Sequence, residues 1–294
     1  MPSIPSRPVR VATAAAGAGV TAGAAILAWG ALVGARRLKV REEEVGVEAP
    51  GAPRLRVAHL SDLHLGRIGR AHRAAARAVN AFEPHLVALT GDFLQRRRGL
   101  LTLDAFLGLL DPAPALVAVA GNWDHGAGVV ATGLERVLAD HGGALLLNGH
   151  RTLEVEGRAV LVTGLDDPVK GRPDLVAALA GAPSPDLHLL LVHAPAWRDS
   201  MGDAMDALAR HGGDPRARGL RPHLILSGHT HGGQVRLGGL AWTPRGSGRY
   251  LRGWYRDGPV AMFVSPGVGT VVPVRVGAPP EVGLFTIVPP PRPG

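Results

Sequence analysis

The chain has 294 residues, of which 46% are hydrophobic and 19% charged, so it is neither disordered nor collagen-like and can bury a sizeable core. It contains no cysteine, which excludes disulfides, thiolate zinc sites, iron–sulfur clusters and a cysteine nucleophile but is compatible with both cytosol and periplasm. Its formal charge of +8 and pI of about 11.1 suggest an anionic partner.

An uncharged stretch runs from Val11 to Ala35. Its 25 positions are enough for a membrane-spanning helix, which needs about 20. We therefore expect a single membrane anchor. The alternatives are a signal peptide cleaved near residues 22–24, where Ala-Gly-Ala suits a peptidase, and a buried alanine-rich helix. Two basic residues precede the stretch and four follow it, which favours a body on the cytoplasmic face, with an exported body as the alternative.

Residues 42–53 are charged and then punctuated by proline and glycine. The sequence thus predicts an anchor and linker over residues 1–53 and one folded domain over residues 54–290. Within that domain, short apolar runs alternate with segments of helical spacing as far as about residue 145. The runs predict strands, and the spaced segments predict helices, at Leu55–Leu60, Arg70–Phe82, His85–Leu89, Leu100–Leu110, Leu116–Ala120 and Val129–Asp140. This alternation is typical of an α/β sheet with crossover helices.

After Leu145 the predicted strands are more closely spaced. Strands and helices are expected at Thr152–Val155, Ala159–Gly164, Pro173–Ala180 (helix), Leu187–Val192, Ser200–Arg210 (helix) and His223–Leu226. Residues 234–288 are expected to be strands and turns.

Polar residues recur at the ends of the predicted strands. They are Asp62, His64, Asp92, Asn122, His193, His229 and His231. The carboxyl ends of parallel strands are where α/β sheets gather ligands. In an extended segment, residues two apart point the same way, so the pairs Asp62/His64 and His229/His231 can each face one metal centre.

Seven candidate ligands are too many for one ion. They suit two ions about 3.5–4 Å apart that share a carboxylate, and Asp92 is the natural bridge. A mixed set of carboxylates and imidazoles favours two divalent ions, with manganese first and iron or zinc as alternatives.

These residues stand in five ordered blocks: Asp62-x-His64, Gly91-Asp92, Gly121-Asn122, His193 and Gly228-His229-x-His231. The series resembles the calcineurin-like metallophosphoesterases over about residues 54–290. Within that superfamily the chain is similar to the membrane-anchored bacterial phosphodiesterase branch, through Gly-His-Thr-His-Gly-Gly-Gln and the tail at residues 264–281. It is also similar to UDP-2,3-diacylglucosamine pyrophosphatase-like proteins of lipid A synthesis.

The resemblance implies a four-layer α/β/β/α sandwich and two metal sites. One site would use Asp62, His64, Asp92 and His231; the other would use Asp92, Asn122, His193 and His229. The family usually has histidine directly after the asparagine, but this chain has Trp123 there. His125 or a water is then expected to take the acid role. Asp124 matches the family's acidic residue and is expected to orient a neighbouring histidine, so the predicted catalytic residues are Asn122, Asp124 and His125.

The expected activity is hydrolysis of a phosphodiester or pyrophosphate bond in an amphiphilic substrate at a membrane, such as UDP-2,3-diacylglucosamine. A metal-dependent nuclease is one alternative, motivated by the high pI. However, only Lys39 and Lys170 are lysines and no long basic run is interleaved with aromatics, so the excess of arginine is typical of a solvated surface and no nucleic acid is expected. The other alternative, motivated by Trp123, is a metal-binding scaffold with impaired catalysis.

Overall fold

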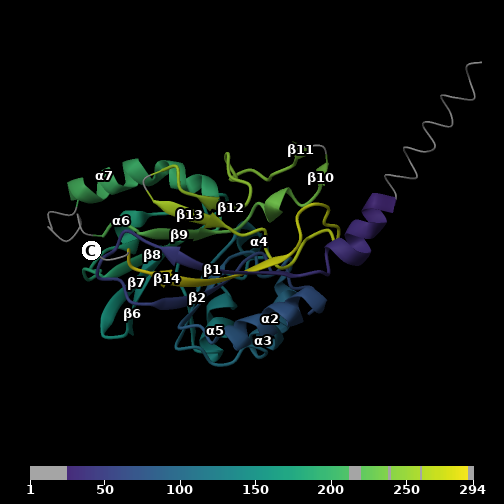
Figure 1. Cartoon of the computed structure of the whole chain (residues 1–294), viewed down its shortest axis with the longest axis horizontal. Helices are drawn as coiled ribbons and strands as arrows, with labels where there is room; N and C mark the ends of the chain where they lie inside the picture. The colour runs from purple at the N-terminus through teal and green to yellow at the C-terminus, as the bar shows by residue number, and fades with distance from the viewer. Residues whose placement is uncertain (1–24, 212–219, 238–239, 259, 291–294) are drawn as a thin grey trace, which may run out of the picture.

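Two six-stranded sheets form the centre of the computed structural model, which describes residues 25–211, 220–237, 240–258 and 260–290 (Figure 1). In the first sheet, β2, β3, β4 and β5 run parallel, and β14 enters antiparallel beside β2. The strand order is β1 (Lys39–Gly46), β14 (Glu281–Val288), β2 (Leu55–Leu60), β3 (Leu86–Thr90), β4 (Ala115–Val119) and β5 (Gly143–Leu145).

The second sheet has four parallel strands flanked by an antiparallel strand at each edge. Its order is β12 (Gly253–Tyr255), β13 (Ala261–Val264), β9 (Leu224–Ser227), β8 (Leu187–Leu191), β7 (Arg158–Gly164) and β6 (Gly149–Val155). A separate short hairpin joins β10 (Arg236–Leu237) to β11 (Leu240–Ala241). Because the central strands β3, β4 and β8 are buried on both faces, they read as continuous apolar runs rather than as alternating ones.

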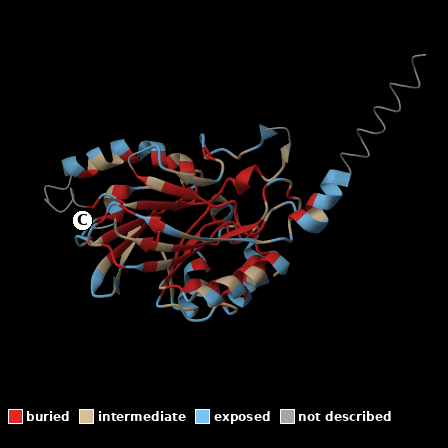
Figure 2. Ribbon diagram, viewed as in Figure 1, coloured by how far each residue is buried: buried red, intermediate tan, exposed pale blue. Residues whose placement is uncertain are grey.

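Three apolar clusters define the layers. One lies between the sheets and contains Val57, Val117, Leu189 and Phe263. The outer face of the first sheet is covered by α2 (Arg70–Phe82), α3 (Leu100–Leu107) and α5 (Leu134–Asp140). The outer face of the second sheet is covered by α6 (Leu175–Ala178) and α7 (Met201–His211). The buried residues in Figure 2 follow these faces, and the two-sheet α/β fold is confirmed.

Helix α2 illustrates how the sequence specifies an element. Ala71, Ala75 and Val79 recur at a spacing of four residues and are buried against the sheet, as predicted for Arg70–Phe82. The helix ends where Glu83 takes a left-handed conformation. The helix predicted over Val129–Asp140 is shorter, because residues 130–133 form turns before α5 begins.

Residues 39–46 lie within the expected linker, yet they form β1, the edge strand of the first sheet. All eight residues pair in register with β14, from Lys39 with Glu281 to Gly46 with Val288. Only Val45 of this strand is buried, and five of its eight residues are charged, so no apolar run marked it in the sequence. The first sheet thus begins ahead of the expected domain boundary at residue 54.

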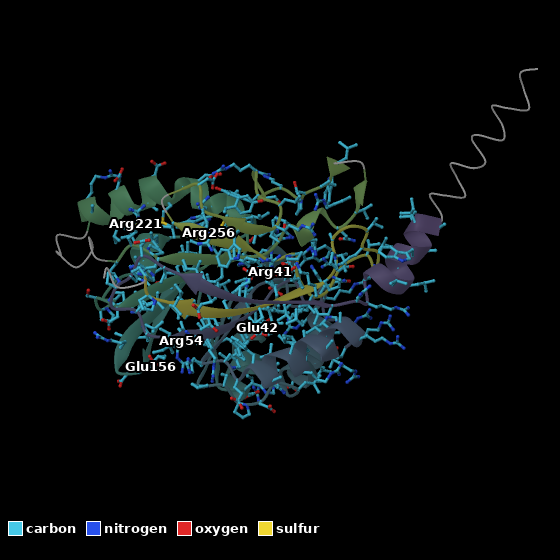
Figure 3. The ribbon with its side chains drawn as sticks, viewed as in Figure 1. Arg41, Glu42, Arg54, Glu156, Arg221 and Arg256 are labelled. Atoms are coloured by element: carbon cyan, nitrogen blue, oxygen red, sulfur yellow. The ribbon has the colours of Figure 1, made fainter. Side chains whose placement is uncertain are left out.

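Surface ion pairs and hydrogen bonds connect segments that are far apart in the chain. The backbone N–H of Arg54 donates to Oε2 of Glu156 at 3.3 Å, which joins the start of β2 to the turn between β6 and β7 (Figure 3). The indole N–H of Trp254 donates to Glu43 at 2.7 Å, which connects the edges of the two sheets.

The expected membrane anchor is contradicted. Residues 25–29 are helical and continue into the π-helical turn η1 (Gly30–Gly34), whose two glycines are buried against residues 274–276. Among the residues that the structure describes, no helix is long and apolar enough to cross a membrane. The predicted location of the body, held to a membrane by a single helix, is therefore wrong. Residues 11–24 of the predicted segment lie outside the described residues.

Candidate metal centre

The candidate ligands come together from five loops, each at the carboxyl end of a strand. Asp62 and His64 follow β2, Asp92 follows β3, and Asn122 begins α4 (Asn122–Gly126) just after β4. His193 follows β8, and His229 and His231 follow β9. All six aspartate and histidine side chains are buried. The parallel strands thus deliver these polar groups to one place, as the sequence predicts.

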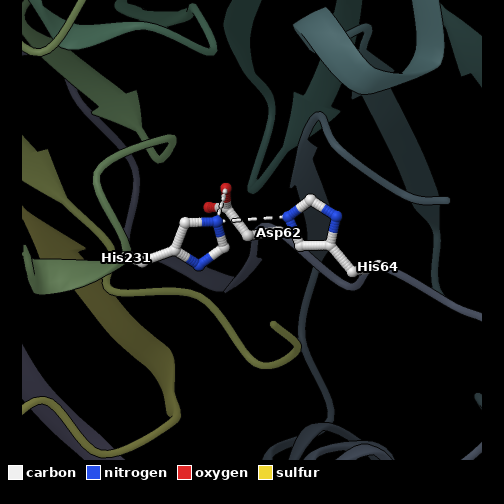
Figure 4. Close-up of side chains that lie close together, drawn as sticks. All are labelled: Asp62, His64 and His231. Carbon is white, nitrogen blue, oxygen red and sulfur yellow. Dashed lines mark hydrogen bonds and ion pairs between the residues drawn. The ribbon is translucent and has the colours of Figure 1, made fainter. Parts of the chain in front are cut away.

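The first group consists of Asp62, His64 and His231 (Figure 4). Nε2 of His64 lies 3.2 Å from Nε2 of His231, which lies 3.6 Å from Oδ1 of Asp62. One potential ligand atom from each residue lies within 4.8 Å of the others. Asp62 is held in place by the Ser61 hydroxyl at 2.6 Å and by the backbone N–H of His229 at 3.0 Å.

The second group consists of Asp92, His193 and His229. Oδ2 of Asp92 lies 3.3 Å from Nε2 of His193, which lies 3.2 Å from Nδ1 of His229. The same carboxylate oxygen is 3.7 Å from Nε2 of His64 in the first group. Asp92 therefore lies between the two groups, where a bridging carboxylate has to be.

The hydrogen bonds of the second group fix two histidine tautomers. Nδ1 of His193 donates to the carbonyl oxygen of Thr90 at 2.7 Å, and Nε2 of His229 donates to the carbonyl oxygen of Arg245 at 2.8 Å. In the neutral rings, the lone pairs of the other two nitrogens face each other and the Asp92 carboxylate. Three acceptors that converge without a donor need a cation, so the donor set fits a divalent metal ion.

The electrostatics agree with this. Burial lowers the pKa of His64 and of His229 to about 4, which keeps both rings neutral as ligands must be. Burial acts to lower the pKa of His193 too, but the Asp92 charge outweighs it and raises that pKa to about 10. Without a cation, a proton on His193 balances Asp92, and a divalent ion would replace that proton.

Five of the seven candidates have a left-handed backbone, which non-glycine residues rarely adopt. They are Asp62, His64, Asp92, His229 and His231, with φ between 44° and 73°. The prediction from the spacing assumed extended segments, but the backbone at these residues is not extended. Asp62 and His64 nevertheless share one group, whereas His229 and His231 divide between the two groups, as the family resemblance implied. Strain of this kind is typical of functional sites.

Asn122 does not cap its helix. Gly121 is the N-cap of α4, and Asn122 is the first residue inside it. The Oδ1 atom of Asn122 is buried and has no hydrogen-bond partner among the described residues. A buried amide oxygen without a donor is costly, so its position beside the second group suits a metal ligand.

Asp124 has a different role from the one expected. Its carboxylate orients no histidine; it accepts hydrogen bonds from the backbone N–H groups of Asp92 at 2.8 Å, Phe93 at 3.0 Å and Gly121 at 2.9 Å. It therefore fixes the loop that carries Asp92 to the loop that carries Asn122. The sequence could not show this, because the donors are backbone groups.

His125 is turned toward Asp166, whose Oδ1 lies 2.6 Å from Nε2 of the ring. The structure does not place His125 in the cavity that opens on the centre. Trp123 lines that cavity instead, with its ring edge-on to His64 at a centroid distance of 5.8 Å.

Arg275 is a buried residue for which the sequence analysis predicted no role. Its guanidinium donates to the carbonyl oxygens of Gly267 at 3.2 Å and Gly269 at 2.5 Å. Gly269 in turn donates its N–H to the carbonyl oxygen of Asp62 at 2.8 Å. Arg275 thus supports the loop beneath the first group. Arg275 lies in the tail at residues 264–281 that carried the family resemblance, but the resemblance assigned it no contact.

A cavity of about 690 Å³ opens on the centre at Asp92, Asn122, His229 and His231. The rest of its wall is mainly apolar, and it includes Leu27, Trp123, Val235, Trp242, Val271 and Val274. Leu27 and Trp242 are exposed. A polar centre thus lies at the end of an apolar cavity.

Comparison with known proteins identifies the family. A sequence model described as "Calcineurin-like phosphoesterase" matches residues 55–233, which contain every candidate ligand. The chain belongs to this family. The phosphoesterase is 30% identical over 255 residues to the "Uncharacterized metallophosphoesterase YkoQ" of Bacillus subtilis, covering 81% of this chain and 85% of the relative.

Two further relatives match at similar length. The phosphoesterase is 30% identical to the "Uncharacterized metallophosphoesterase YkuE" of Bacillus subtilis, covering 79% of this chain and 78% of the relative. It is 28% identical to the "Phosphodiesterase YaeI" of Escherichia coli, covering 79% and 82%. The predicted superfamily and the hydrolase activity on phosphoester bonds are confirmed, and the family uses divalent metal ions.

Proposed function

We propose that this phosphoesterase uses two divalent metal ions to hydrolyse a phosphoanhydride or an activated phosphodiester in a substrate that has an apolar portion. The proposed ligands are Asp62, His64, Asp92, Asn122, His193, His229 and His231. The observation that carries the proposal is the set of buried acceptors around Asp92, which converge without a donor. Manganese is the first metal to test, with iron and zinc next.

When bound, the ions supply charge neutralisation at the phosphate and a nucleophile from water at neutral pH. The protein positions its ligands through contacts already described: Asp124 holds the Asp92 loop, and Thr90 and Arg245 fix the tautomers of His193 and His229. Trp123 and the apolar wall surround the approach to the centre and offer a surface for an apolar portion of the substrate.

The described residues around the cavity that opens on the centre offer no general acid, and this limits the leaving groups that the reaction can use. Apart from the proposed ligands, no titratable side chain is among the described residues that line it. Solvent must then protonate the leaving oxygen, so the reaction favours leaving groups that need no proton in the transition state. A phosphate leaving from a pyrophosphate is such a group, and an alkoxide is not.

The apolar wall supports a substrate with an acyl or similar chain. A UDP-linked lipid such as UDP-2,3-diacylglucosamine combines a pyrophosphate with such chains, and it is the first natural substrate to test.

The test uses the full chain and bis-p-nitrophenyl phosphate. We expect hydrolysis with added manganese, loss of activity in chelator, and recovery when metal is restored. Metal analysis of the same sample should give about two ions per chain. Inactivity with manganese, iron, zinc and cobalt would contradict the proposal. Cleavage of DNA with a steep salt dependence, in place of small esters, would favour a nuclease instead.

A further inference from the structure

A second cavity, of about 650 Å³, also opens beside the centre. It lies between the N-terminal helical segment and the start of α2, and we call it the arginine cavity. Four arginines line it: Arg36, Arg67, Arg70 and Arg73. Gln95 and Thr270 add polar groups to the wall.

The arginine cavity is lined by positively charged side chains and, among the described residues, by no negatively charged ones. No aspartate or glutamate is among its lining residues, and none of the four arginines forms an ion pair with another described residue. All four are exposed, and their gathering around one cavity distinguishes them from paired arginines such as Arg41, which lies 2.7 Å from Glu281, and Arg198, which lies 3.2 Å from Asp257. Four guanidinium groups with no protein counter-charge create a positive potential that attracts an anion.

The arginine cavity is connected to the metal centre by shared residues. His64 lines it and also belongs to the first group of candidate ligands. Val271 lines both the arginine cavity and the apolar cavity, so the two are neighbours at this residue, and at least one candidate ligand of the centre lines each of them. A molecule whose phosphorus lies at the centre can therefore extend into both.

We propose that the arginine cavity binds a second phosphate group of the same substrate, at a position remote from the bond that is cleaved. This inference rests on the proposed function for the position of the first phosphate. Guanidinium groups bind phosphate through paired, charge-assisted hydrogen bonds, and a phosphate monoester carries close to two negative charges at neutral pH. The substrate class is thus an ester or anhydride with an apolar portion and a second, anionic phosphate. UDP-2,3-diacylglucosamine has only the two phosphates that flank the cleaved bond, so this inference favours a different member of the proposed class.

A matched pair of esters tests this on the manganese-loaded full chain. One is p-nitrophenyl ethyl phosphate, and the other carries a second phosphate at the end of its ethyl group. We expect a KM on the order of tenfold lower for the second ester. The double variant Arg67→Ala/Arg70→Ala should lose this preference. The control Arg77→Ala, an exposed arginine on the same helix but outside the cavity, should keep it.

Calorimetric binding gives a readout independent of turnover. Propane-1,3-bisphosphonate should bind the manganese-loaded chain on the order of tenfold tighter than propylphosphonate or inorganic phosphate, and the double variant should lose that difference. Equal KM and Kd values, unchanged in the double variant, would overturn the inference and leave the proposed function standing. If neither ester is hydrolysed but the binding preference is lost in the double variant, the proposed function fails and the arginine cavity is supported.

Discussion

The backbone N–H of Trp123 donates a hydrogen bond of 2.8 Å to Oδ1 of Asp92. This bond occupies one oxygen of the carboxylate and leaves Oδ2 directed at His64 and His193. The residue that replaces the family's usual histidine thus orients the proposed bridge through its backbone, a contact that any side chain at position 123 can keep.

Replacing the bridge should separate metal binding from folding. In Asp92→Asn, the negative charge that holds two dications near each other is gone. We expect bound metal to fall from about two equivalents toward one or none, and turnover to fall by on the order of a thousandfold or more. The metal-free fold should survive, because His193 can lose the proton that balanced Asp92, so no unpaired charge stays buried.

Metal analysis and circular dichroism of the same sample check this. The exposed Asp140→Asn is the matched control and should retain both metals. Two metals and near-normal turnover in Asp92→Asn would show that another carboxylate is the bridge.

Asp124→Asn should behave differently, because Asp124 supports the loops rather than the metals. The variant presents an amide N–H₂ to backbone donors, so bonds to Asp92, Phe93 and Gly121 are weakened together. We expect the metal-free protein to lose about 2–4 kcal/mol of unfolding free energy, and metal affinity to fall with it. Denaturant unfolding in chelator measures the first effect. Unchanged stability with lost metal would instead make Asp124 a ligand.

The pair of His125 and Asp166 predicts a pH dependence of stability. The hydrogen bond to Asp166 raises the pKa of His125. A histidine whose pKa is raised on folding stabilises the folded state. This stabilisation is fully present below the ordinary pKa of about 6.5 and is lost as the pH rises through the pKa of the histidine in the folded protein. Burial acts to raise the pKa of Asp166, but hydrogen bonds from His125 and from backbone amides outweigh it and lower that pKa. The stability that Asp166 contributes is therefore lost only as the pH falls through its lowered pKa.

His125→Gln keeps a donor but cannot titrate. The wild type should therefore be more stable than the variant at pH 6, and the difference in unfolding free energy should shrink by pH 9. Parallel unfolding curves in chelator across this range give the answer. A difference that grows with pH would contradict the assignment. Turnover should change little, since His125 does not line the apolar cavity.

Trp123→His tests the absence of an acid in the cavity. A histidine there can protonate a leaving alkoxide, which p-nitrophenolate does not require. We expect the variant to cleave an alkyl phosphodiester on the order of tenfold faster, with little change for bis-p-nitrophenyl phosphate. Trp123→Phe is the control that alters the wall without adding an acid. Equal effects on both esters would mean that position 123 acts on binding alone.

Gly34→Ala should detach the N-terminal helical segment. A Cβ at Gly34 would overlap the carbonyl oxygen of Arg275, which is backbone and cannot move aside easily. We expect trypsin to cleave at Arg36 and Arg37 at least about fivefold faster, and substrates with apolar chains to lose affinity as Leu27 leaves the cavity. Gly46→Ala, where a Cβ meets nothing within 4 Å, is the control. Identical cleavage rates would show that the segment tolerates the change.

Much of the site could be predicted because its residues follow strands whose apolar runs are plain in the sequence. Asp62, Asp92 and His193 each end such a run, and parallel strands deliver their ends to one edge. What the sequence missed rests on backbone groups. Asp124 accepts hydrogen bonds from the backbone N–H groups of Asp92, Phe93 and Gly121, and no pattern of side chains encodes these bonds. The division of His229 and His231 between the two groups was predicted by the family resemblance, not by their spacing.

The missed parts of the fold have the same character. Strand β1 is held by pairing with β14 rather than by burial, so its residues carry no apolar pattern. The segment over residues 25–34 is apolar enough to suggest a membrane helix, but Gly30 and Gly34 let it approach residues 274–276 closely. Apolar composition indicates that a segment will be buried, but it does not show whether lipid or protein covers it.

The position of β14 has a consequence for synthesis on the ribosome. In the first sheet β1 has only β14 as a neighbour, and β14 joins it to β2. The nascent chain therefore cannot close this sheet until residues 281–288 have left the exit tunnel, long after all the candidate ligands have emerged. The loop at residues 267–269 that braces Asp62 also arrives late. Assembly of the centre therefore waits for residues 267–269 and 281–288 to be synthesised, and nascent chains that end before them would lack the support of Asp62.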